Sequence, residues 1–405
     1  MKSLAVIALT ALGMLAPAVR ADVVTDWNDK AVAIMLAERL PGGVPGARVL
    51  AIMHIAMFDA ANASEGRYLP YRAATADAAG ASPEAAMHAA ARHVLAELYP
   101  KHKAAADAYY GSAVARLPAG RATASGIAAG EKAARAMLEE RKTDGFFAPD
   151  SYRPVTKPGG YIPTAMPIMS HLQLAKPFAL RSPSQFRPGP PPALTSAQWA
   201  RDYNETKELG GANSVKRTAW QTETGRFWVL SGTYAWNEAA REIVKARPLS
   251  TMESARLFAL LNIAISDAFV AIFDAKYQYN FWRPVTAIRN GDIDGNDATE
   301  RDHAWTPLIA TPVHPEYPCA HCVADGSGGA VLKSFFGKGS LPDFTLTYSE
   351  MPGVQRKYTS IQQLEDEVAM ARIWGGVHYR TSNEVGNALG RTVGEYVMEH
   401  YLRPR

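Results

Sequence analysis

The stretch LFALLNIAISDAFVAIFDAKYQYNFWRP, residues 257–284, is the most informative segment for the fold. Its apolar residues recur at helical spacing, and only Asn262, Asp267 and Asp274 interrupt them, which predicts a long core helix over residues 251–275. The same polar residues argue against a membrane span. Lys276 follows the apolar run directly, and Arg283 comes after a further six residues, four of them aromatic. We expect the aromatic rings to pack while both cationic heads reach one pocket.

Helical spacing of apolar residues recurs through most of the remaining chain, whereas alternating strand patterns are scarce. We predict further helices near residues 27–39, 47–63, 83–98, 101–116, 121–142, 196–209, 235–246, 321–336, 361–374 and 382–401. The sequence therefore indicates an all-α protein.

An internal similarity indicates that these helices form two bundles. Residues 47–60 align without gaps on residues 255–268, and seven of the fourteen positions are identical. Chance similarity between two alanine-rich amphipathic helices is the alternative. We expect two similar helical bundles packed as one compact body, with His54 a hydrogen-bonded core histidine. The first copy lacks the cationic chemistry, because Tyr68 stands where the second has Lys276.

A proline-rich stretch divides the chain. Residues 146–195 hold eleven of the 27 prolines, and proline removes helix donors, so this connector must be extended coil. Its aromatic residues suggest that it packs on the body. We expect an N-terminal bundle at residues 22–145 and a C-terminal bundle at residues 196–405.

The first 21 residues have the pattern of a signal peptide: Lys2, an apolar run from Leu4 to Leu15, and the small-residue site Val19-Arg20-Ala21. Export to the periplasm or secretion is therefore expected. Removing Lys2 and Arg20 lowers the net charge from +4 to 41 − 39 = +2. A net charge this small does not indicate nucleic-acid binding. No later segment has the pattern of a membrane span.

Three short segments of the second half place cations and imidazoles in a fixed order. They are Lys276 with Arg283-Pro284, the tetrapeptide Pro318-Cys319-Ala320-His321, and Arg372 with His378. A tetrahedral oxyanion needs donors on several oxygens at once, which lysine, arginine and a helix start supply. Histidine adds a nucleophile, metal ligand or general acid near neutral pH. The set predicts one oxyanion site.

This ordered set resembles the superfamily that joins vanadium-dependent haloperoxidases to type 2 phosphatidic acid phosphatases and bacterial acid phosphatases. Its pattern is Lys-x6-Arg-Pro, then Pro-Ser-Gly-His, then Ser-Arg-x5-His-x3-Asp. The first part is complete here, but Cys319 and Ala320 replace Ser and Gly, while Ala371 and Ser382 stand for the last Ser and Asp. Residues 200–390 carry the resemblance best, and the residues that flank Arg283 and His378 look like those of soluble bacterial haloperoxidases.

The resemblance implies a role for each matching residue. Lys276, Arg283 and Arg372 would bind oxyanion oxygens, His378 would bond the central atom, and His321 would move the proton. Other predicted members of the site are the oxyanion-binding Cys319, Ala320 and Gly376, and His314 and Trp282 as halide or outer-layer residues. Because Ser382 replaces the expected Asp, the second nitrogen of His378 needs another acceptor, a backbone carbonyl or Glu384.

Cys319 and Cys322, the only cysteines, form a Cys-x-x-Cys at this site. The alternatives are a disulfide, two free thiols, or a redox or metal role. A free Cys319 would face the oxyanion, where peroxide oxidises thiols. We therefore expect haloperoxidase activity to require the bridged form.

Three functions remain open at this point. The first is a vanadate-dependent haloperoxidase that uses peroxide and a halide. The second is a phosphomonoesterase with a phosphohistidine intermediate and no cofactor. The third is a non-catalytic oxyanion-binding protein, which the replacements at Cys319, Ala320 and Ser382 suggest.

Overall fold

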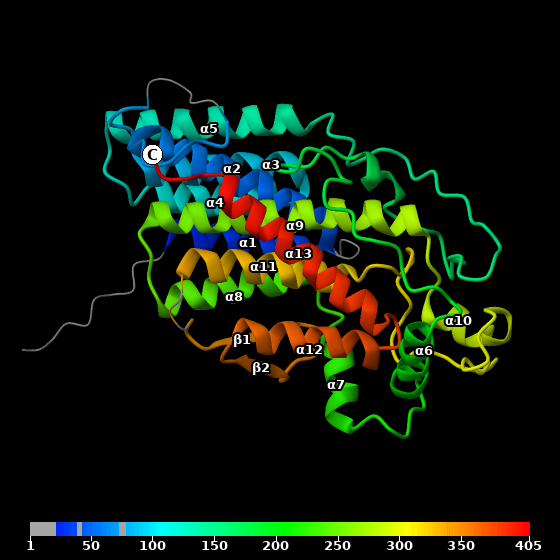
Figure 1. The fold of residues 1–405 in the computed structure, drawn as a ribbon. Helices are drawn as coiled ribbons and strands as arrows, with labels where there is room; N and C mark the ends of the chain where they lie inside the picture. The colour runs from blue at the N-terminus through cyan, green and yellow to red at the C-terminus, as the bar shows by residue number, and fades with distance from the viewer. Residues whose placement is uncertain (1–21, 39–42, 73–77, 338, 340) are drawn as a thin grey trace, which may run out of the picture.

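The computed structural model describes residues 22–38, 43–72, 78–337, 339 and 341–405, so the expected signal peptide lies outside the described residues. Over these ranges the regular secondary structure is helical apart from one hairpin, which confirms the all-α prediction (Figure 1). The N-terminal part holds α1 Val23–Ala37, α2 Val44–Glu65, α3 Pro83–Leu98, α4 Lys103–Val114 and α5 Arg121–Arg141.

The C-terminal part carries the remaining long helices. They are α6 Ala197–Gly210, α7 Ala219–Phe227, α8 Gly232–Ala246, α9 Thr251–Tyr279, α10 Pro284–Arg289, α11 Ala320–Phe336, α12 Ile361–Trp374 and α13 Arg380–His400. Strands β1 Phe344–Thr347 and β2 Gln355–Tyr358 pair antiparallel, with Phe344 opposite Tyr358. Short 3₁₀ turns lie at Pro100–His102, Ser170–Leu174 and Gly291–Ile293.

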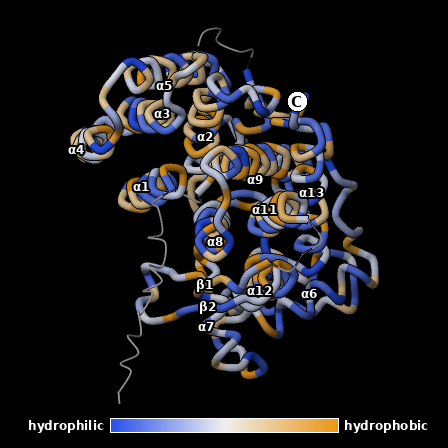
Figure 2. The backbone as a smooth tube through the Cα atoms, turned by 90° about the vertical axis from the view of Figure 1, so that its left-hand side faces the viewer, coloured by the Kyte–Doolittle hydropathy of each residue, from blue (hydrophilic) through white to orange (hydrophobic). Residues whose placement is uncertain are grey.

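Helix α9 lies at the centre of the protein, between α2 on one side and α11 and α13 on the other (Figures 1 and 2). A capping box of Ser250 and Glu253 starts it, and Asn280 in the left-handed conformation (φ 51°) ends it. The helix is thus longer than the sequence predicted, and Lys276 lies in its last turn rather than after it. Residues from Leu257 to Lys276 are all buried, which explains the near-continuous apolar run.

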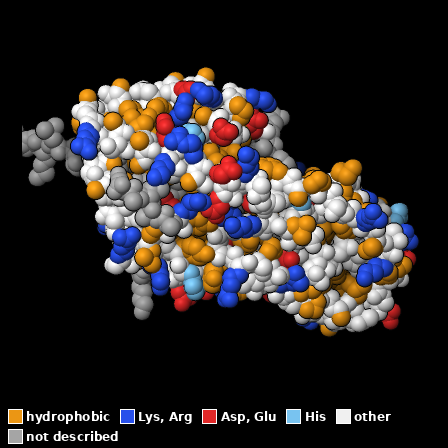
Figure 3. Space-filling view, turned by 90° about the horizontal axis from the view of Figure 1, so that it is seen from above, with side chains coloured by type: hydrophobic (Ala, Val, Ile, Leu, Met, Phe, Trp, Pro, Cys, Tyr) orange, Lys and Arg blue, Asp and Glu red, His pale blue; other side chains and the backbone are white. Residues whose placement is uncertain are grey.

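Among the described residues, α2 and α9 are long and apolar enough to cross a membrane by length and composition alone. Buried positions make up 89% of the most apolar window of α2 and 100% of that of α9. Both therefore have the character of core helices. On the face shown in Figure 3, basic and acidic side chains are intermingled, which fits the small net charge.

Helices α11 and α13 pack unusually closely, and this contact positions the site. A Cβ atom added at Gly326 would lie 2.1 Å from the Asn387 carbonyl oxygen, and one at Gly390 would lie 2.1 Å from the Val323 carbonyl oxygen. The glycines therefore lower helix propensity but permit backbone contact between the two helices. The start of α11 and the start of α13 consequently face each other.

The repeated sequence has a structural counterpart in the contacts between α2 and α9. His54 and Asn262 occupy equivalent positions, and both join a buried amide network through Asn28 and Asn237, with His54 Nε2 2.9 Å from Asn28 Nδ2. The equivalent aspartates also act alike. Asp59 accepts the backbone N–H groups of Tyr71 and Arg72, and Asp267 accepts those of residues 178–180.

The proline-rich connector lies along these helices. The Tyr161 N–H donates to the Asn280 carbonyl oxygen (2.8 Å), and Gly160 pairs with Phe281 as an isolated bridge. Asp267 holds the segment near Phe178 as described above. The connector thereby meets the chain just after Lys276, at the edge of the predicted site.

Candidate functional site

Five of the predicted residues line one cavity of about 280 Å³. Its lining includes His314, Ala320, His321, Arg372 and His378, which come from three separate stretches of the second half. The other walls are mostly apolar and include Ile168, Met169, Val229, Phe269, Phe273 and Ile309. Lys276 and Arg283 do not line the cavity. Arg283 contacts His314 and His378 of the lining, and Lys276 lies close enough to His378 for its charge to act on that ring.

Lys276 is fully buried, and its Nζ donates to the carbonyl oxygens of Pro315 (3.0 Å) and Glu316 (2.8 Å). Burial, followed by the nearby Arg283 guanidinium, lowers the pKa of this amine well below its usual value, although Glu316 acts in the opposite direction. An anion beside Lys276 would raise this pKa again, because a nearby negative charge favours the charged amine.

Arg283 precedes α10 and joins the loop before α11 to the segment before α13. Its Nε donates to the His314 carbonyl oxygen (2.9 Å), and its Nη1 donates to the Val377 carbonyl oxygen (2.8 Å). Its Nη1 also lies 3.2 Å from His378 Nε2, and its Nη2 lies 2.9 Å from His314 Nδ1. Burial lowers the pKa of this guanidinium to about 10, so it remains charged at neutral pH.

His378 is held in a single tautomer. Because a guanidinium can only donate, His378 Nε2 must accept from Arg283. His378 Nδ1 then carries the proton and donates to Glu316 Oε1 at 2.7 Å. Burial and the Arg283 charge lower the pKa of this imidazole well below its usual value. The ring is therefore neutral, and its Nε2 lone pair accepts from Arg283 in this structure, so a ligand bonded at Nε2 takes the place of that hydrogen bond.

Glu316 is the functional residue that sequence reasoning missed. Its carboxyl group is fully buried and also accepts the Tyr379 N–H (3.2 Å). Burial raises its pKa to about 7, while Lys276 and Arg283 act to lower it. The expected alternative, Glu384, is exposed on α13, so that assignment is corrected. The missing Asp at Ser382 signalled that an acceptor was needed, but nothing in the sequence located it at Glu316.

Ser382 is nevertheless close to this carboxylate. The Ser382 hydroxyl is buried and contacts Glu316, whose pKa it lowers. The Ser382 carbonyl oxygen accepts the Cys319 N–H at 3.1 Å. Glu316 thus supplies, from the loop before α11, the carboxylate that the related pattern places at the start of α13.

Two buried polar atoms at the cavity have no protein partner. Arg372, in the last turn of α12, donates through Nη1 to the Trp228 carbonyl oxygen, but its Nε is unpaired. His321 bonds the backbone of Leu230, and its Nε2 is likewise unpaired. Burial and then the Arg372 charge lower the pKa of His321. Unpaired buried groups are costly, so a polar ligand here would be stabilising.

The start of α11 adds backbone donors. The first bond inside this helix runs from the Val323 N–H to the Cys319 carbonyl oxygen (3.2 Å). The N–H groups of Ala320 and His321 therefore have no partner within the helix, and the helix dipole favours an anion there. Replacing the family's glycine with Ala320 leaves these N–H groups in place.

The cysteines are two free thiols, both buried, so the disulfide that the sequence left open is not formed in this structure. Cys319 caps α11, and its sulfur accepts the Cys322 N–H at 3.2 Å. The Cys322 thiol donates to Cys319 Sγ at 2.6 Å. Cys319 therefore keeps the capping role that a serine would have at this position.

One sequence prediction needs correction, and another is narrowed. The Gly376 N–H donates to the Ile373 carbonyl oxygen (2.9 Å), so it is unavailable to an anion. Gly376 instead has a positive φ of 73° and packs against Gly210, whose carbonyl oxygen would lie 2.3 Å from an added Cβ. Trp282, expected as a halide or outer-layer residue, stacks on Trp199 at 5.9 Å in a separate aromatic cluster and does not line the cavity, so only its outer-layer role stays a prediction.

His314 was expected either to contact the halide or to support the residues that bind the oxyanion. It lines the cavity, receives Arg283 Nη2 at Nδ1 and meets the Phe273 ring edge-on at 5.0 Å. Its role toward a halide stays a prediction.

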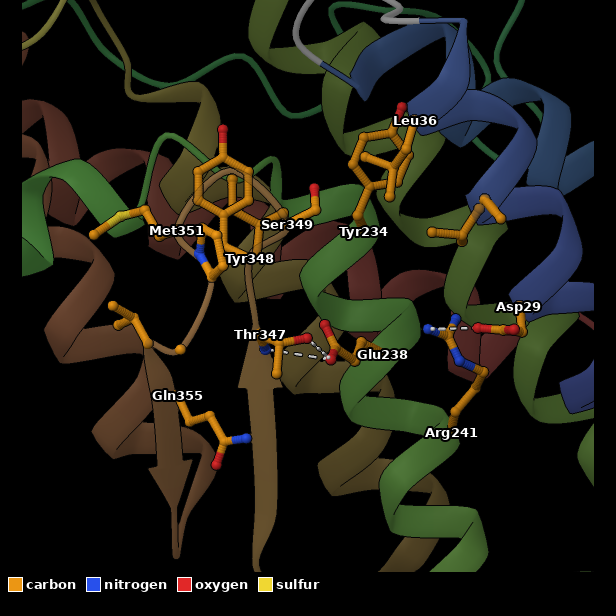
Figure 4. Close-up of a pocket in the computed structure, with 16 residues that line it drawn as sticks. Asp29, Leu36, Tyr234, Glu238, Arg241, Thr347, Tyr348, Ser349, Met351 and Gln355 are labelled. Atoms are coloured by element: carbon orange, nitrogen blue, oxygen red, sulfur yellow. Dashed lines mark hydrogen bonds and ion pairs between the residues drawn. The ribbon is translucent and has the colours of Figure 1, made fainter.

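A second pocket, of about 420 Å³, lies between α1, α8 and the β-hairpin and contains none of the predicted residues. Figure 4 shows that its charges already have partners: Glu238 accepts from the Thr347 hydroxyl (2.8 Å), and Arg241 pairs with Asp29 (3.5 Å). The cavity with His321 and His378 is therefore the candidate active site.

The candidate site suits an oxyanion better than a bare metal cation. Lys276, Arg283 and Arg372 supply positive charge, and Arg372 Nε and His321 Nε2 supply unpaired donors or acceptors. Within the described residues no cluster of three His, Cys, Asp or Glu side chains could hold a cation. Vanadate, which is an oxyanion bonded through one histidine in the related pattern, fits this set.

Comparisons with known proteins agree with this geometry. Residues 256–405 match the family model of the VCPO second helical-bundle domain. Vanadium chloroperoxidase from Curvularia inaequalis is 26% identical over 273 residues, which cover 51% of this chain and 44% of that protein. The chain thus aligns with less than half the length of this relative.

The fold extends the match to nearly the whole chain. The crystal structure of the first bacterial vanadium-dependent iodoperoxidase superposes with a TM-score of 0.81 at 24% identity, over 94% of this chain and 96% of that one. The chain has the fold of the vanadium haloperoxidases. A bacterial vanadium-dependent chloroperoxidase in its apo form superposes with a TM-score of 0.72 at 16% identity, over 87% of this chain and 92% of that one. At these identities the structures establish the haloperoxidase fold alone.

Proposed function

We propose that this haloperoxidase relative is an enzyme that binds vanadate and oxidises a halide with hydrogen peroxide. The observation that carries the proposal is the His378–Glu316 pair. It fixes a neutral imidazole at the cavity wall, whose Nε2 lone pair accepts from Arg283 until a ligand takes its place, and the basic side chains of Lys276, Arg283 and Arg372 are buried near this ring.

Each residue has a definite part in the proposal. Lys276, Arg283 and Arg372 would bind the oxygens of vanadate, and His378 Nε2 would bond the vanadium. Bound vanadate would supply the Lewis acidity that activates peroxide toward a halide. His321 Nε2 lacks a partner and lies in the same cavity, so it is placed to accept or return a proton.

Burial strengthens these interactions. Charges act more strongly in a low-dielectric site than in water, and donors that are already fixed need no reorganisation during the reaction. Arg283 and Lys276 are each held by backbone carbonyl oxygens and therefore cannot swing away from the cavity. The apolar walls and the small volume favour small co-substrates such as peroxide and halide.

A phosphomonoesterase is the second candidate, and the same observation favours it. The His378 Nε2 lone pair could attack phosphorus when no vanadate is bound, and the cations would hold phosphate oxygens equally well. His321 would then protonate the leaving alcohol. An oxyanion-binding protein without catalysis is the remaining alternative.

Two assays on the purified chain separate these functions. Halide oxidation by peroxide that appears only after vanadate addition supports the haloperoxidase. Hydrolysis of p-nitrophenyl phosphate that vanadate inhibits supports the phosphatase. Neither activity, with vanadate still bound, leaves the binding protein. His378→Ala should abolish whichever activity is found, whereas the exposed His303→Ala is the matched control.

Export is part of the proposal and rests on the sequence of residues 1–21 alone. Expression of the full chain in a bacterial host, followed by N-terminal sequencing of the periplasmic and medium fractions, tests it. A protein retained in the cytoplasm with an intact N-terminus would contradict export.

A further inference from the structure

We propose that Cys319 and Cys322 form a dithiol that hydrogen peroxide oxidises reversibly to a disulfide at the wall of the candidate site. The two sulfurs lie 2.6 Å apart, and both side chains are fully buried. A disulfide bond is about 2.05 Å long, so only a small movement separates the thiol pair from the bridged form.

The backbone around the pair is already fixed. The Cys319 N–H donates to the Ser382 carbonyl oxygen, and Gly386 of α13 packs against both cysteines. An added Cβ at Gly386 would lie 2.5 Å from the Cys319 carbonyl oxygen and 3.2 Å from Cys322 Cβ. Closure therefore proceeds by rotation of the two side chains and leaves the helix start, with its N–H groups, in place.

The surroundings distinguish the two sulfurs. Burial alone would raise the pKa of Cys319, but the hydrogen bond from Cys322 and the Arg372 charge bring it down to about 7. Burial and the bond to Cys319 raise the pKa of Cys322. Cys319 is therefore the nucleophile and Cys322 the resolving thiol, because the thiolate is the reactive form.

The reaction balances with peroxide as the oxidant. The Cys319 thiolate attacks one peroxide oxygen, an S–O bond forms, the O–O bond breaks, and hydroxide leaves as water after taking a proton. Cys322 then attacks the sulfur of the sulfenic acid, the S–S bond forms, and the S–O bond breaks to release a second water. Two thiols lose one electron each, and one peroxide gains two.

The burial of the two sulfurs limits which oxidants can reach them. Cys319 does not line the cavity, but its neighbour Ala320 and the adjacent Arg372 do. A molecule the size of peroxide can reach this wall from a cavity of about 280 Å³, whereas a peptide disulfide such as oxidised glutathione is too large to approach the buried sulfurs. The pair is thus oxidised by peroxide rather than by oxidised glutathione.

The dithiol has a clear consequence for the site. A lone thiolate exposed to peroxide proceeds to irreversible sulfinic acid. With Cys322 in contact, the sulfenic acid is captured as a disulfide, which a dithiol reductant reverses. The pair therefore protects the start of α11 in the presence of peroxide.

The test uses the full chain, reduced and freed of reductant, without vanadate or halide. After exposure to peroxide the protein is denatured, alkylated and analysed by mass spectrometry. We expect the peptide with both cysteines to lose two hydrogens, to resist alkylation and to recover after dithiothreitol. Two alkylated thiols, or a sulfinic acid at Cys319, would overturn the proposal.

Two variants and a second oxidant sharpen the test. Cys322→Ser should accumulate a Cys319 that has gained two oxygens and does not recover, and a Cys319 that stays reduced would refute its role as nucleophile. Cys319→Ser should leave Cys322 alkylatable. Oxidised glutathione should leave the wild type unreacted, and equal rates for both oxidants would refute the restricted access. Because vanadate is absent, none of these results depends on the haloperoxidase proposal.

Discussion

Glu316→Leu removes the acceptor that fixes His378 while it keeps an apolar side chain of similar length. The bond from His378 Nδ1 to Glu316 Oε1 is 2.7 Å long, and both groups are buried. Hydrogen bonds to charged groups contribute about 1.5–3 kcal/mol, and losing the outer partner of a ligating histidine costs about 10–100-fold in affinity or activity. A 10–100-fold loss corresponds to about 1.4–2.8 kcal/mol, so the two expectations agree.

Glu316→Gln should cost less than Glu316→Leu. The Tyr379 N–H donates to Oε1, which orients the amide so that its oxygen still faces His378. The tautomer is then retained and only the charge is lost, so we expect about 10-fold or less. Adding Ser382→Asp, which restores the carboxylate of the related pattern beside position 316, should recover part of this loss.

The assay is vanadate affinity together with the turnover of halide oxidation. Thermal unfolding of each variant shows whether the protein remains folded. If folded Glu316→Leu bound vanadate within about twofold of the wild type, far from the expected range, the positioning role of Glu316 would be refuted.

Four further outcomes are expected. Lys276→Ala should lower kcat/KM, with a loss of transition-state stabilisation of about 2–4 kcal/mol, and near-normal kinetics would show that Lys276 does not belong to the site. Gly376→Ala should destabilise the fold rather than act on affinity alone, because its φ is positive and Gly210 blocks a Cβ; an unchanged melting temperature contradicts this. Burial raises the pKa of Asp267 to about 6 from 3.8, so the folded state binds the proton more tightly than the unfolded state does. Its contribution to stability is therefore full below about pH 4 and falls by about 2–3 kcal/mol as the pH rises through 6, and urea unfolding should show a shallower decline in Asp267→Asn. Trp282→Phe should leave vanadate affinity unchanged, since Trp282 lies outside the cavity, and a large loss would restore it to the site.

Local signals account for what the sequence predicted correctly about the fold. The apolar run of residues 257–275 is buried on all sides in α9, and the Asn and Asp residues that interrupt it bind internal partners. Short or polar elements left no comparable periodicity. Helix α7 is nine residues long and starts with a capping box rather than an apolar stripe, and β1 and β2 have four residues each.

The charged residues of the site could be predicted from the sequence, because each motif lies within one short segment of the chain. The contacts that complete it join distant parts of the chain. Glu316 meets His378 across 62 positions, and Gly376 is required by the backbone of Gly210 on another helix. Spacing could show that Ser382 left an acceptor missing, but only the packing of the loop before α11 against α13 identifies Glu316.

The most direct test of the central claim is calorimetric titration of orthovanadate into the wild type, His378→Ala and the surface control His303→Ala. The wild type and His303→Ala should each bind vanadate at a single site, and His378→Ala should lose binding altogether while its melting temperature is kept. Equal binding by His378→Ala and the wild type, or no binding by the folded wild type, would contradict the assignment of this cavity as a vanadate site.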